Sequence, residues 1–246
     1  MLIAILADLH ANLQATQAVL DHARAVGAGR YVVLGDIVGY GGDPGPVLDI
    51  VTGLAEDGAL VLRGNHDDMA SDPRKEMNAQ AASAALWTRS QLSGSQRRYL
   101  EHLPLTIEDE DRLYVHADAA APARWRYVFD AESALTSLNG TTQRMVFCGH
   151  VHMPMVYALQ PSGRMLPFAP TPGKSAPLLA HRRWHVVLGS VGQPRDGNAA
   201  ACYALYDTRR HEYRLERVAY DVGAAAARIR AAGLPDMLAE RLYSGR

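Results

Sequence analysis

The stretch LIAILADLH, residues Leu2 to His10, decides the fold class because an unbroken apolar run passes directly into the pair Asp8-x-His10. A continuous apolar run is typical of a strand that is covered on both faces. Apolar residues then recur at helical spacing from Leu13 to Val26, Gly27 follows where a helix would end, and a second apolar run covers Tyr31–Leu34. Strand, helix and strand in this order predict a βαβ unit and an α/β fold.

The same alternation continues along the chain. Further helices are predicted from Pro46 to Gly58, at two or three places between Glu76 and His102, from an Asp130 cap to Gly140, and after Asp221. The chain after Met145 is rich in strands, and the Pro- and Gly-rich segment Pro161–Pro177 indicates a loop or hairpin. No linker divides the sequence, so we expect one domain over residues 1–246. The predicted strands are Leu2–Ala7, Tyr31–Leu34, Ala59–Leu62, Leu113–Val115, Met145–Cys148, Val186–Leu188 and Tyr203–Tyr206.

Composition excludes several other classes of protein. The 246 residues include 25 Lys and Arg against 26 Asp and Glu, are 48% hydrophobic and contain 2 Cys. These values exclude a disordered chain and a disulfide scaffold, and we found no segment of membrane-spanning length and no signal peptide. The net charge of -1 provides no overall field for nucleic acid or anionic membranes. We therefore expect a cytoplasmic protein with buried, unpaired Cys148 and Cys202, no membrane partner and no sequence-specific binding of nucleic acid.

Five of the predicted strands end in residues that are able to bind a metal ion. In open α/β sheets, sites form outside the carboxyl ends of the strands, so segments that are dispersed in the sequence can converge there. Residues two apart in an extended chain point to the same side, and this spacing would aim both members of Asp8-x-His10 and of His150-x-His152 at one point. The residues at the five strand ends are Asp8 and His10; Asp36; Asn65, His66 and Asp67; His116; and His150 and His152.

The donor atoms at these strand ends predict two divalent metal ions. Imidazole nitrogen, carboxylate oxygen and one amide oxygen, without thiolate, suit Mn, Fe, Zn, Co or Ni. Seven such groups are too many for one tetrahedral ion and suit two ions that share a carboxylate. Two carboxylates against two divalent cations leave a local charge of about +2, which selects anions. The groups are Asp8, His10, Asp36, Asn65, His116, His150 and His152.

These residues resemble the motif series of the calcineurin-like metallophosphoesterase superfamily. That series is Asp-x-His, Gly-Asp, Gly-Asn-His-Asp/Glu, a strand ending in His, and Gly-His-x-His, and all five motifs occur here. The segments Gly35–Tyr40, Val115–Ala117 and Gly189–Asp196 look like the small bacterial and archaeal branch, which is related to diadenosine tetraphosphatase. The resemblance spans nearly the whole chain and implies a four-layer α-β-β-α sandwich of two mixed sheets flanked by helices, with a dimetal site at the carboxyl ends of the strands.

The resemblance also implies a role for each residue of the site. A metal-bridging hydroxide would attack phosphorus in line, and His66, which is not a ligand, would protonate the leaving oxygen or stabilise charge there. Asp67 is expected either to orient His66 or to cap a turn. Asp8, His10 and His152 would hold one metal ion, Asn65, His116 and His150 would hold the other, and Asp36 would bridge the two.

Two positions depart from the family's pattern. Relatives usually have Gly where this chain has Ala11, and many have Asn-Pro where it has Val187-Leu188. Ala11 puts a close backbone approach in doubt, and Val187-Leu188 puts the loop near the metals in doubt. Neither departure removes a ligand.

The expected function is that of a metal-dependent phosphoesterase acting on a small phosphoester. A phosphodiesterase is expected first, a phosphomonoesterase or a protein or nucleotide phosphatase is the alternative, and a non-catalytic scaffold of the same fold is a third hypothesis. Arg195 and Tyr40 are candidates for substrate binding, with Arg195 gripping phosphate or pairing with a nearby acid on the surface. The pocket wall is expected from residues 39–46, 69–80 and 161–177. A homodimer is left open.

Overall fold

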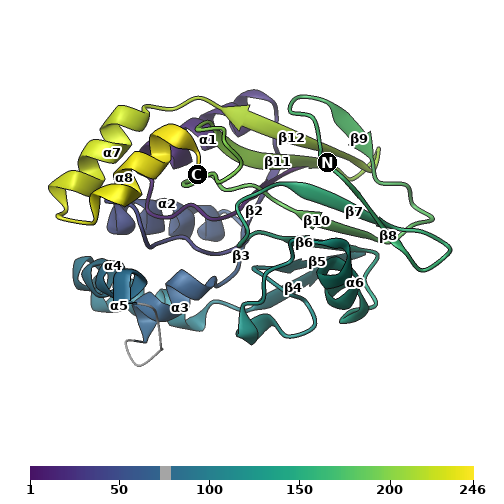
Figure 1. The fold of residues 1–246 in the computed structure, drawn as a ribbon, viewed down its shortest axis with the longest axis horizontal. Helices are drawn as coiled ribbons and strands as arrows, with labels where there is room; N and C mark the ends of the chain where they lie inside the picture. The colour runs from purple at the N-terminus through teal and green to yellow at the C-terminus, as the bar shows by residue number, and fades with distance from the viewer. Residues whose placement is uncertain (73–78) are drawn as a thin grey trace.

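The computed structural model describes residues 1–72 and 79–246, in which two six-stranded sheets pack against each other with helices on their outer faces (Figure 1). In the first sheet, β1, β2 and β3 are parallel to one another, and β11 pairs antiparallel with β1. Its order is β3 (Leu60–Val61), β2 (Arg30–Val33), β1 (Leu2–Leu6), β11 (Ala201–Asp207), β12 (Glu212–Val218) and β9 (Ser175–Pro177).

The second sheet is also mixed. Strands β5, β6 and β10 are parallel to one another, whereas β4, β7 and β8 pair antiparallel with their neighbours. Its order is β4 (Thr106–Asp109), β5 (Arg112–Val115), β6 (Met145–Cys148), β10 (Trp184–Val187), β7 (Met155–Leu159) and β8 (Met165–Phe168).

Several helices have capping residues at their ends. The side chains of Asn12, Asp130 and Asp221 each accept a backbone N–H of the first turn of the helix that follows, and Gly27 takes a φ of 82° just beyond the first helix. The helices are α1 (Leu13–Ala25), α2 (Pro44–Glu56), α3 (Asn65–Ser71), α4 (Ala79–Gln91), α5 (Gly94–His102), a short 3₁₀ turn (Pro122–Arg124), α6 (Ala131–Asn139), α7 (Val222–Ala231) and α8 (Asp236–Ser244).

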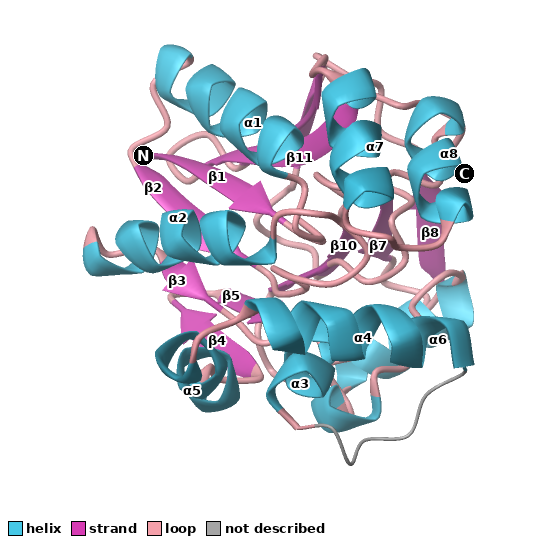
Figure 2. Ribbon diagram, turned by 90° about the vertical axis from the view of Figure 1, so that its left-hand side faces the viewer, coloured by secondary structure: helices cyan, strands magenta, loops and turns pink. Residues whose placement is uncertain are grey.

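Three layers of apolar side chains hold the elements together. Between the sheets, Ile3 and Ile5 of β1 meet Phe147 of β6 and Val186 of β10, all fully buried. The other face of the first sheet packs on α1 and α2, and the other face of the second sheet packs on α6. Figure 2 shows α1, α2 and α7 on one side of the strands. The predicted four-layer α-β-β-α sandwich is confirmed.

The structure adds elements that the apolar runs did not mark. Strand β4 carries the alternating sequence TIED at a sheet edge, and α3 begins inside the motif Asn65-His66-Asp67, where metal-ligand chemistry was the dominant signal. The segment 161–177 contains β8 and β9 rather than one loop. Both cysteines are buried and unpaired, as predicted. In the described residues no helix has the length and apolarity that crossing a membrane requires.

Candidate metal centre

The five predicted segments converge at one edge of the sandwich, where the carboxyl ends of strands from both sheets meet. β1, β2 and β3 run in one direction in the first sheet, and β5 and β6 are parallel neighbours in the second. Each of these strands is followed by at least one polar residue of the site, and all of these residues except Asn65 are buried. They are Asp8 and His10 after β1, Asp36 after β2, Asn65 and His66 after β3, His116 after β5, and His150 and His152 after β6.

The paired ligands converge through left-handed turns. Asp8, His10, His150 and His152 have φ values of 56°, 47°, 68° and 63°, so the prediction that an extended chain aims each pair is wrong. L-residues adopt this conformation at a cost of about 1–2 kcal/mol each, and backbone bonds between loops hold it here. The N–H of Asp8 donates to the Gly35 carbonyl at 3.1 Å.

Glycine is required where two of these loops touch. A Cβ atom on Gly64 would lie 2.2 Å from the backbone nitrogen of Asp36, and one on Gly149 would lie 2.6 Å from Oδ2 of Asp8. These contacts are too close for any side chain. The glycines in Gly-Asn-His-Asp and Gly-His-x-His therefore let the loops approach closely enough to share one site.

The first cluster of ligand atoms comes from Asp8, His10, Asp36 and His152. One ligand atom from each of these residues lies within 4.8 Å of the others. Nε2 of His152 is 3.5 Å from Oδ1 of Asp8, and Nε2 of His10 is 3.7 Å from Oδ2 of Asp36. The cluster combines two imidazoles with two carboxylates, a set that suits a divalent first-row metal ion.

The second cluster shares Asp36 with the first. Its other members are His116 and His150, and Nε2 of His116 lies 3.4 Å from Oδ2 of Asp36 and 3.2 Å from Nδ1 of His150. Oδ1 of Asn65 lies 3.0 Å from the same Nε2 of His116. One carboxylate thus belongs to two ligand groups, which is the arrangement expected for a pair of metal ions.

Backbone carbonyls fix the protonation of all four imidazoles. A carbonyl oxygen only accepts hydrogen bonds, so the ring nitrogen facing it carries the hydrogen, and in a neutral ring the other nitrogen presents a lone pair. Those other nitrogens all point into the site, and Nε2 of His10 and Nε2 of His152 lie 3.1 Å apart. Two nitrogen lone pairs that face each other repel unless a cation lies between them. The ligand atoms of the site therefore fit a bound metal ion. The pairs are His10 Nδ1 with Val38 at 3.3 Å, His116 Nδ1 with Leu34 at 2.9 Å, His150 Nε2 with Trp125 at 3.0 Å, and His152 Nδ1 with Gln193 at 2.6 Å.

Mutual electrostatics keep the carboxylates ionised despite their burial. Burial alone would raise the pKa of Asp8, but the adjacent His152 outweighs it and lowers the pKa to about 2. Burial also opposes ionisation of Asp36, whose pKa is nevertheless held well below its usual value by His116 and His66. For His116, burial opposes protonation, while Asp36 raises the pKa to about 9. The site therefore keeps its two carboxylates in the form that binds cations.

His66 lies beside the first cluster, at the beginning of α3. Its backbone N–H donates to Oδ1 of Asp36 at 2.8 Å, and its ring lies 5.0 Å from the ring of His10. Burial lowers the pKa of His66, while Asp36 opposes this change. The carboxylate of Asp67 accepts the backbone N–H groups of Ile37, Val38 and Gly64, so it makes the contacts of a turn cap.

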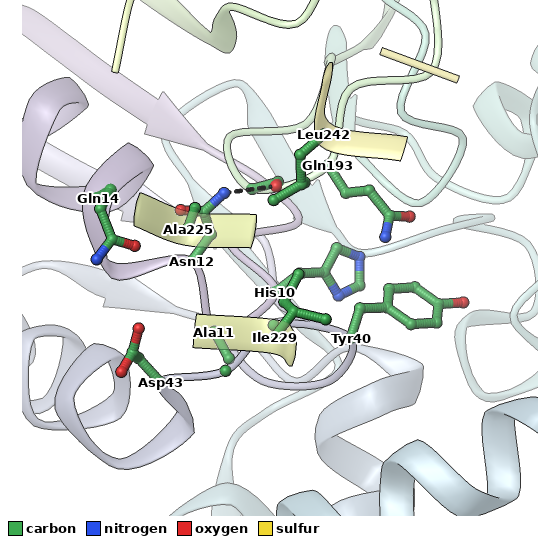
Figure 3. A pocket seen from close by; sticks show the side chains of 13 residues that line it. His10, Ala11, Asn12, Gln14, Tyr40, Asp43, Gln193, Ala225, Ile229 and Leu242 are labelled. Carbon is green, nitrogen blue, oxygen red and sulfur yellow. Dashed lines mark hydrogen bonds between the residues drawn. The ribbon is translucent and has the colours of Figure 1, made fainter. Parts of the chain in front are cut away.

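Tyr40 and Arg195 lie next to His66 and His10. The Tyr40 ring is 4.3 Å from the His66 ring and 4.7 Å from the His10 ring, and the Arg195 guanidinium lies over Tyr40 at 5.8 Å. A narrow cavity of about 10 Å³ runs from His10, Tyr40 and Gln193 to α7 and α8 (Figure 3). Of the expected walls, residues 39–46 contribute to this cavity and residues 161–177 do not, while residues 73–78 lie outside the described residues.

The register of the strands places β9, at the end of the segment 161–177, away from the site. β9 pairs with β12 at Tyr213, which faces Tyr206, and Tyr206 in turn faces Ile3 near the start of β1. The metal ligands follow the opposite end of β1. β9 therefore does not form a pocket wall next to the metals.

The two departures from the family pattern leave the site intact. Ala11 adopts a φ of 50°, the conformation that glycine takes more easily, and still donates its N–H to the Ile37 carbonyl. After Leu188, the loop is tied to the site because the Ser190 hydroxyl donates to the Asp8 carbonyl at 2.7 Å. Neither the close approach nor the loop is lost.

Sequence reasoning missed Tyr127, an aromatic residue beside the second cluster. Tyr127 stacks on His150 with ring centroids 4.2 Å apart and planes at 10°, although its side chain is 51% exposed. A second cavity, of about 540 Å³ with its opening, lies along Tyr127 and the start of α6. Tyr127 stands in a loop without a motif, so no sequence signal marked it.

The sandwich and the paired clusters define an α/β protein with a candidate centre for two metal ions. A family model described as the calcineurin-like phosphoesterase superfamily domain matches residues 1–211. An uncharacterized protein of Methanocaldococcus jannaschii is 33% identical over 251 residues, covering 100% of this chain and 98% of that protein. The chain belongs to the calcineurin-like phosphoesterase superfamily.

Solved structures agree with this assignment. A metallophosphoesterase from Sphaerobacter thermophilus is similar with a TM-score of 0.88 and 34% sequence identity, covering 100% of both chains. A hypothetical protein from Pyrococcus horikoshii shares the fold with a TM-score of 0.80 and 22% identity, covering 100% of this chain and 98% of that one. This chain is accordingly a calcineurin-like metallophosphoesterase by family, fold and metal-binding cluster.

Proposed function

We propose that the protein is a phosphodiesterase that depends on two divalent metal ions. The observation that carries this proposal is the position of Asp36 in both ligand clusters, with one ring nitrogen of each of four histidines directed at the space around it. Membership of a phosphoesterase superfamily and the similarity to a metallophosphoesterase at 34% identity support the same reaction class. A phosphomonoesterase with the same metal centre is the alternative.

Each metal ion has its own set of ligands in this proposal. When bound, two divalent ions supply charge neutralisation for phosphoryl oxygens and water that is acidic enough to act as a nucleophile near neutral pH. Asp36 holds the two positions together because it reaches both clusters. Asp8, His10 and His152 hold one ion, and Asn65, His116 and His150 hold the other.

His66 is proposed as the proton donor to the leaving oxygen. It is anchored through its backbone to Asp36, its ring lies beside that of His10, and it contributes to neither ligand cluster. Burial lowers the pKa of His66, and the adjacent Asp36 opposes part of this change. A positioned general acid contributes about 10²–10⁴-fold to a rate.

The test compares a generic aryl phosphodiester with its monoester. Protein stripped with a chelator should be inactive on both, and addition of Mn should restore hydrolysis with a higher kcat/KM for the diester. A higher kcat/KM for the monoester would favour the phosphatase alternative. No hydrolysis of either ester by protein that holds two metal ions would contradict the catalytic proposal and favour a scaffold.

Two variants locate the reaction in this site. Asp36→Asn should lose metal and activity together, because it removes the charge that both clusters share. His66→Gln should keep both metal ions and lose about 10²–10⁴-fold in kcat. Circular dichroism controls for folding, and metal content separates the two effects. Wild-type rates in either folded variant would contradict this mechanism.

A further inference from the structure

Arg195 lies beside the candidate centre, in a loop that also supports the metal ligands. Its backbone N–H donates to the carbonyl of His152 at 3.3 Å. Its guanidinium donates to Oε1 of Gln193 at 3.0 Å and lies over the ring of Tyr40. Tyr40 in turn contacts the rings of His66 and His10. The guanidinium is therefore held on the side of the site where His66 lies.

The charge of Arg195 has no acidic partner among the ion pairs of the described residues. The acid next to it in sequence, Asp196, is taken by Arg217. The partners of Arg195 are the neutral amide of Gln193 and the ring and hydroxyl of Tyr40, and its Nε is buried without a hydrogen-bond partner in the described residues. The half-buried guanidinium therefore keeps a donor that an anion or a water molecule can accept.

The arrangement suits a phosphoryl group. Guanidinium presents a planar fork of donors that matches phosphate oxygens, and its bonds to them are charge-assisted. Two carboxylates do not neutralise two divalent ions, and Arg195 adds a further positive charge at the edge of the same site. This excess attracts both the singly charged phosphodiester and the inorganic phosphate product.

We propose that Arg195 binds a phosphoryl oxygen of the substrate and of the phosphate product, with Tyr40 and Gln193 acting as positioning residues for its guanidinium. This inference rests on the proposed function for its substrate, but the phosphate subsite itself can be tested without turnover. Arg195 thereby gives the centre a third phosphate contact beside the two metal positions.

The first test measures the binding of inorganic phosphate to the Mn-loaded protein by calorimetry. Arg195→Ala should weaken binding about tenfold, equivalent to about 1.4 kcal/mol, without changing the metal content. Arg195→Lys should fall in between, because a lysine keeps the charge but lacks the fork. Arg164→Ala is the matched control, since it removes the same charge from an exposed turn between β7 and β8. Phosphate affinity of Arg195→Ala within twofold of wild type would overturn the proposal.

The second test concerns the positioning role of Tyr40. Tyr40→Phe keeps the ring under the guanidinium but removes the hydroxyl that Arg195 contacts, so it should lose less phosphate affinity than Tyr40→Leu, which should lose severalfold. If Tyr40 acts through Arg195, Tyr40→Leu should cost nothing further in the Arg195→Ala background. Equal, additive losses in both backgrounds would contradict a positioning role.

Kinetics distinguish failure of the two proposals. With an active wild type, Arg195→Ala should raise KM for the diester about tenfold and change kcat less. If the wild type hydrolyses no phosphoester, the proposed function fails, while the phosphate affinities still decide the role of Arg195. Unchanged KM and unchanged phosphate affinity in an active Arg195→Ala variant would remove Arg195 from the site and leave the phosphoesterase proposal standing.

Discussion

At the scale of single residues, Ala11 has a strained backbone conformation that a substitution by glycine should relieve. A φ of 50° is strained for a residue with a Cβ atom, and the adjacent His10 also has a positive φ. Ala11→Gly should relieve this strain, in part offset by the greater freedom of glycine in the unfolded chain. We expect a gain of about 0.5–1 kcal/mol in the free energy of unfolding, measured by urea denaturation.

Ala15→Gly provides the matched control for that variant. Ala15 lies in the interior of α1, where the backbone is helical, so the same substitution should destabilise the protein by about 1 kcal/mol or more. A loss of stability in Ala11→Gly would show that the methyl group of Ala11 contributes more by packing than the strained φ costs.

The sequence predicted which residues meet at the site. It did not predict the backbone conformations that direct their side chains into it. Each ligand-type residue follows an apolar run, and parallel strand ends share an edge, so Asp8, Asp36 and His116 could be expected together. The left-handed φ of Asp8 could not, because it depends on backbone bonds to Gly35, 27 residues further along the chain. The same limit applies to Arg195, whose unpaired charge follows from the capture of Asp196 by Arg217.

At the scale of elements, His185 links β10 to α6 and makes their packing sensitive to acid. It is fully buried, its Nε2 lies 2.9 Å from Oγ of Ser137, and burial lowers its pKa to about 3 from an ordinary value of 6.5. The unfolded chain therefore binds a proton that the folded chain excludes. This contribution to stability is complete above pH 6.5 and is lost as pH falls toward 3.

His185→Gln should reduce that acid sensitivity. At pH 5 the proton linkage of His185 amounts to about 2 kcal/mol, so the fall in the free energy of unfolding between pH 7.5 and pH 5 should be smaller by about that amount in the variant. Both proteins are measured with chelator present, so the metal ligands contribute equally. His181→Gln, in an exposed position, is the control and should match wild type. Equal pH slopes in all three proteins would refute the role of His185.

The loop between β10 and β11 is the element that braces the first ligand cluster. The Ser190 hydroxyl donates to the Asp8 carbonyl and accepts the N–H of Gln193, whose own carbonyl fixes the His152 ring. Ser190→Ala should leave a buried N–H unpaired, at a cost of about 1–3 kcal/mol.

Because Gln193 also orients a ligand, Ser190→Ala should weaken metal binding about 10–100-fold. Metal titration and urea denaturation measure the two effects, with Ser175→Ala on the exposed edge strand β9 as control. Metal affinity equal to that of wild type would show that the loop is not needed to hold Asp8 and His152.

The helices and strands differ in how well they could be predicted from the sequence. Strands such as β1 and β6 are buried on both faces, so their apolar runs were sufficient. β4 is half exposed, and α3 is only seven residues long, so neither carries a pattern of sufficient length. α2 begins two residues earlier than predicted because Pro44, rather than Pro46, is its first residue, and it ends at Glu56, two residues before Gly58.

At the scale of the whole molecule, metal should join the two sheets. The ligands come from both sheets, so removal of metal leaves facing lone pairs and two buried carboxylates at their shared edge. At metal concentrations near 1,000 times Kd, one bound ion stabilises a protein by about 4 kcal/mol. Two ions should therefore raise Tm by about 10 °C or more in a domain of this size, measured by calorimetry with Mn or chelator.

Hydrogen exchange locates the metal effect within the molecule. Removal of metal should speed exchange in the loops after β1, β2 and β6 and leave the β8 and β9 edge strands unchanged. A uniform change, or none, would indicate that the clusters are not coupled to the packing of the sheets.

The position of β1 has a consequence for biosynthesis. This first strand is hydrogen-bonded on one side to β2 and on the other to β11, which begins only at Ala201, and its ligands Asp8 and His10 meet His152 and the Gln193 loop. At about 5–20 residues per second, a ribosome takes on the order of 10–40 s to add the intervening chain. During that time the nascent protein carries an open strand edge and lacks the loop that braces Asp8 and His152, so the first ligand cluster is fully supported only after this region has been made.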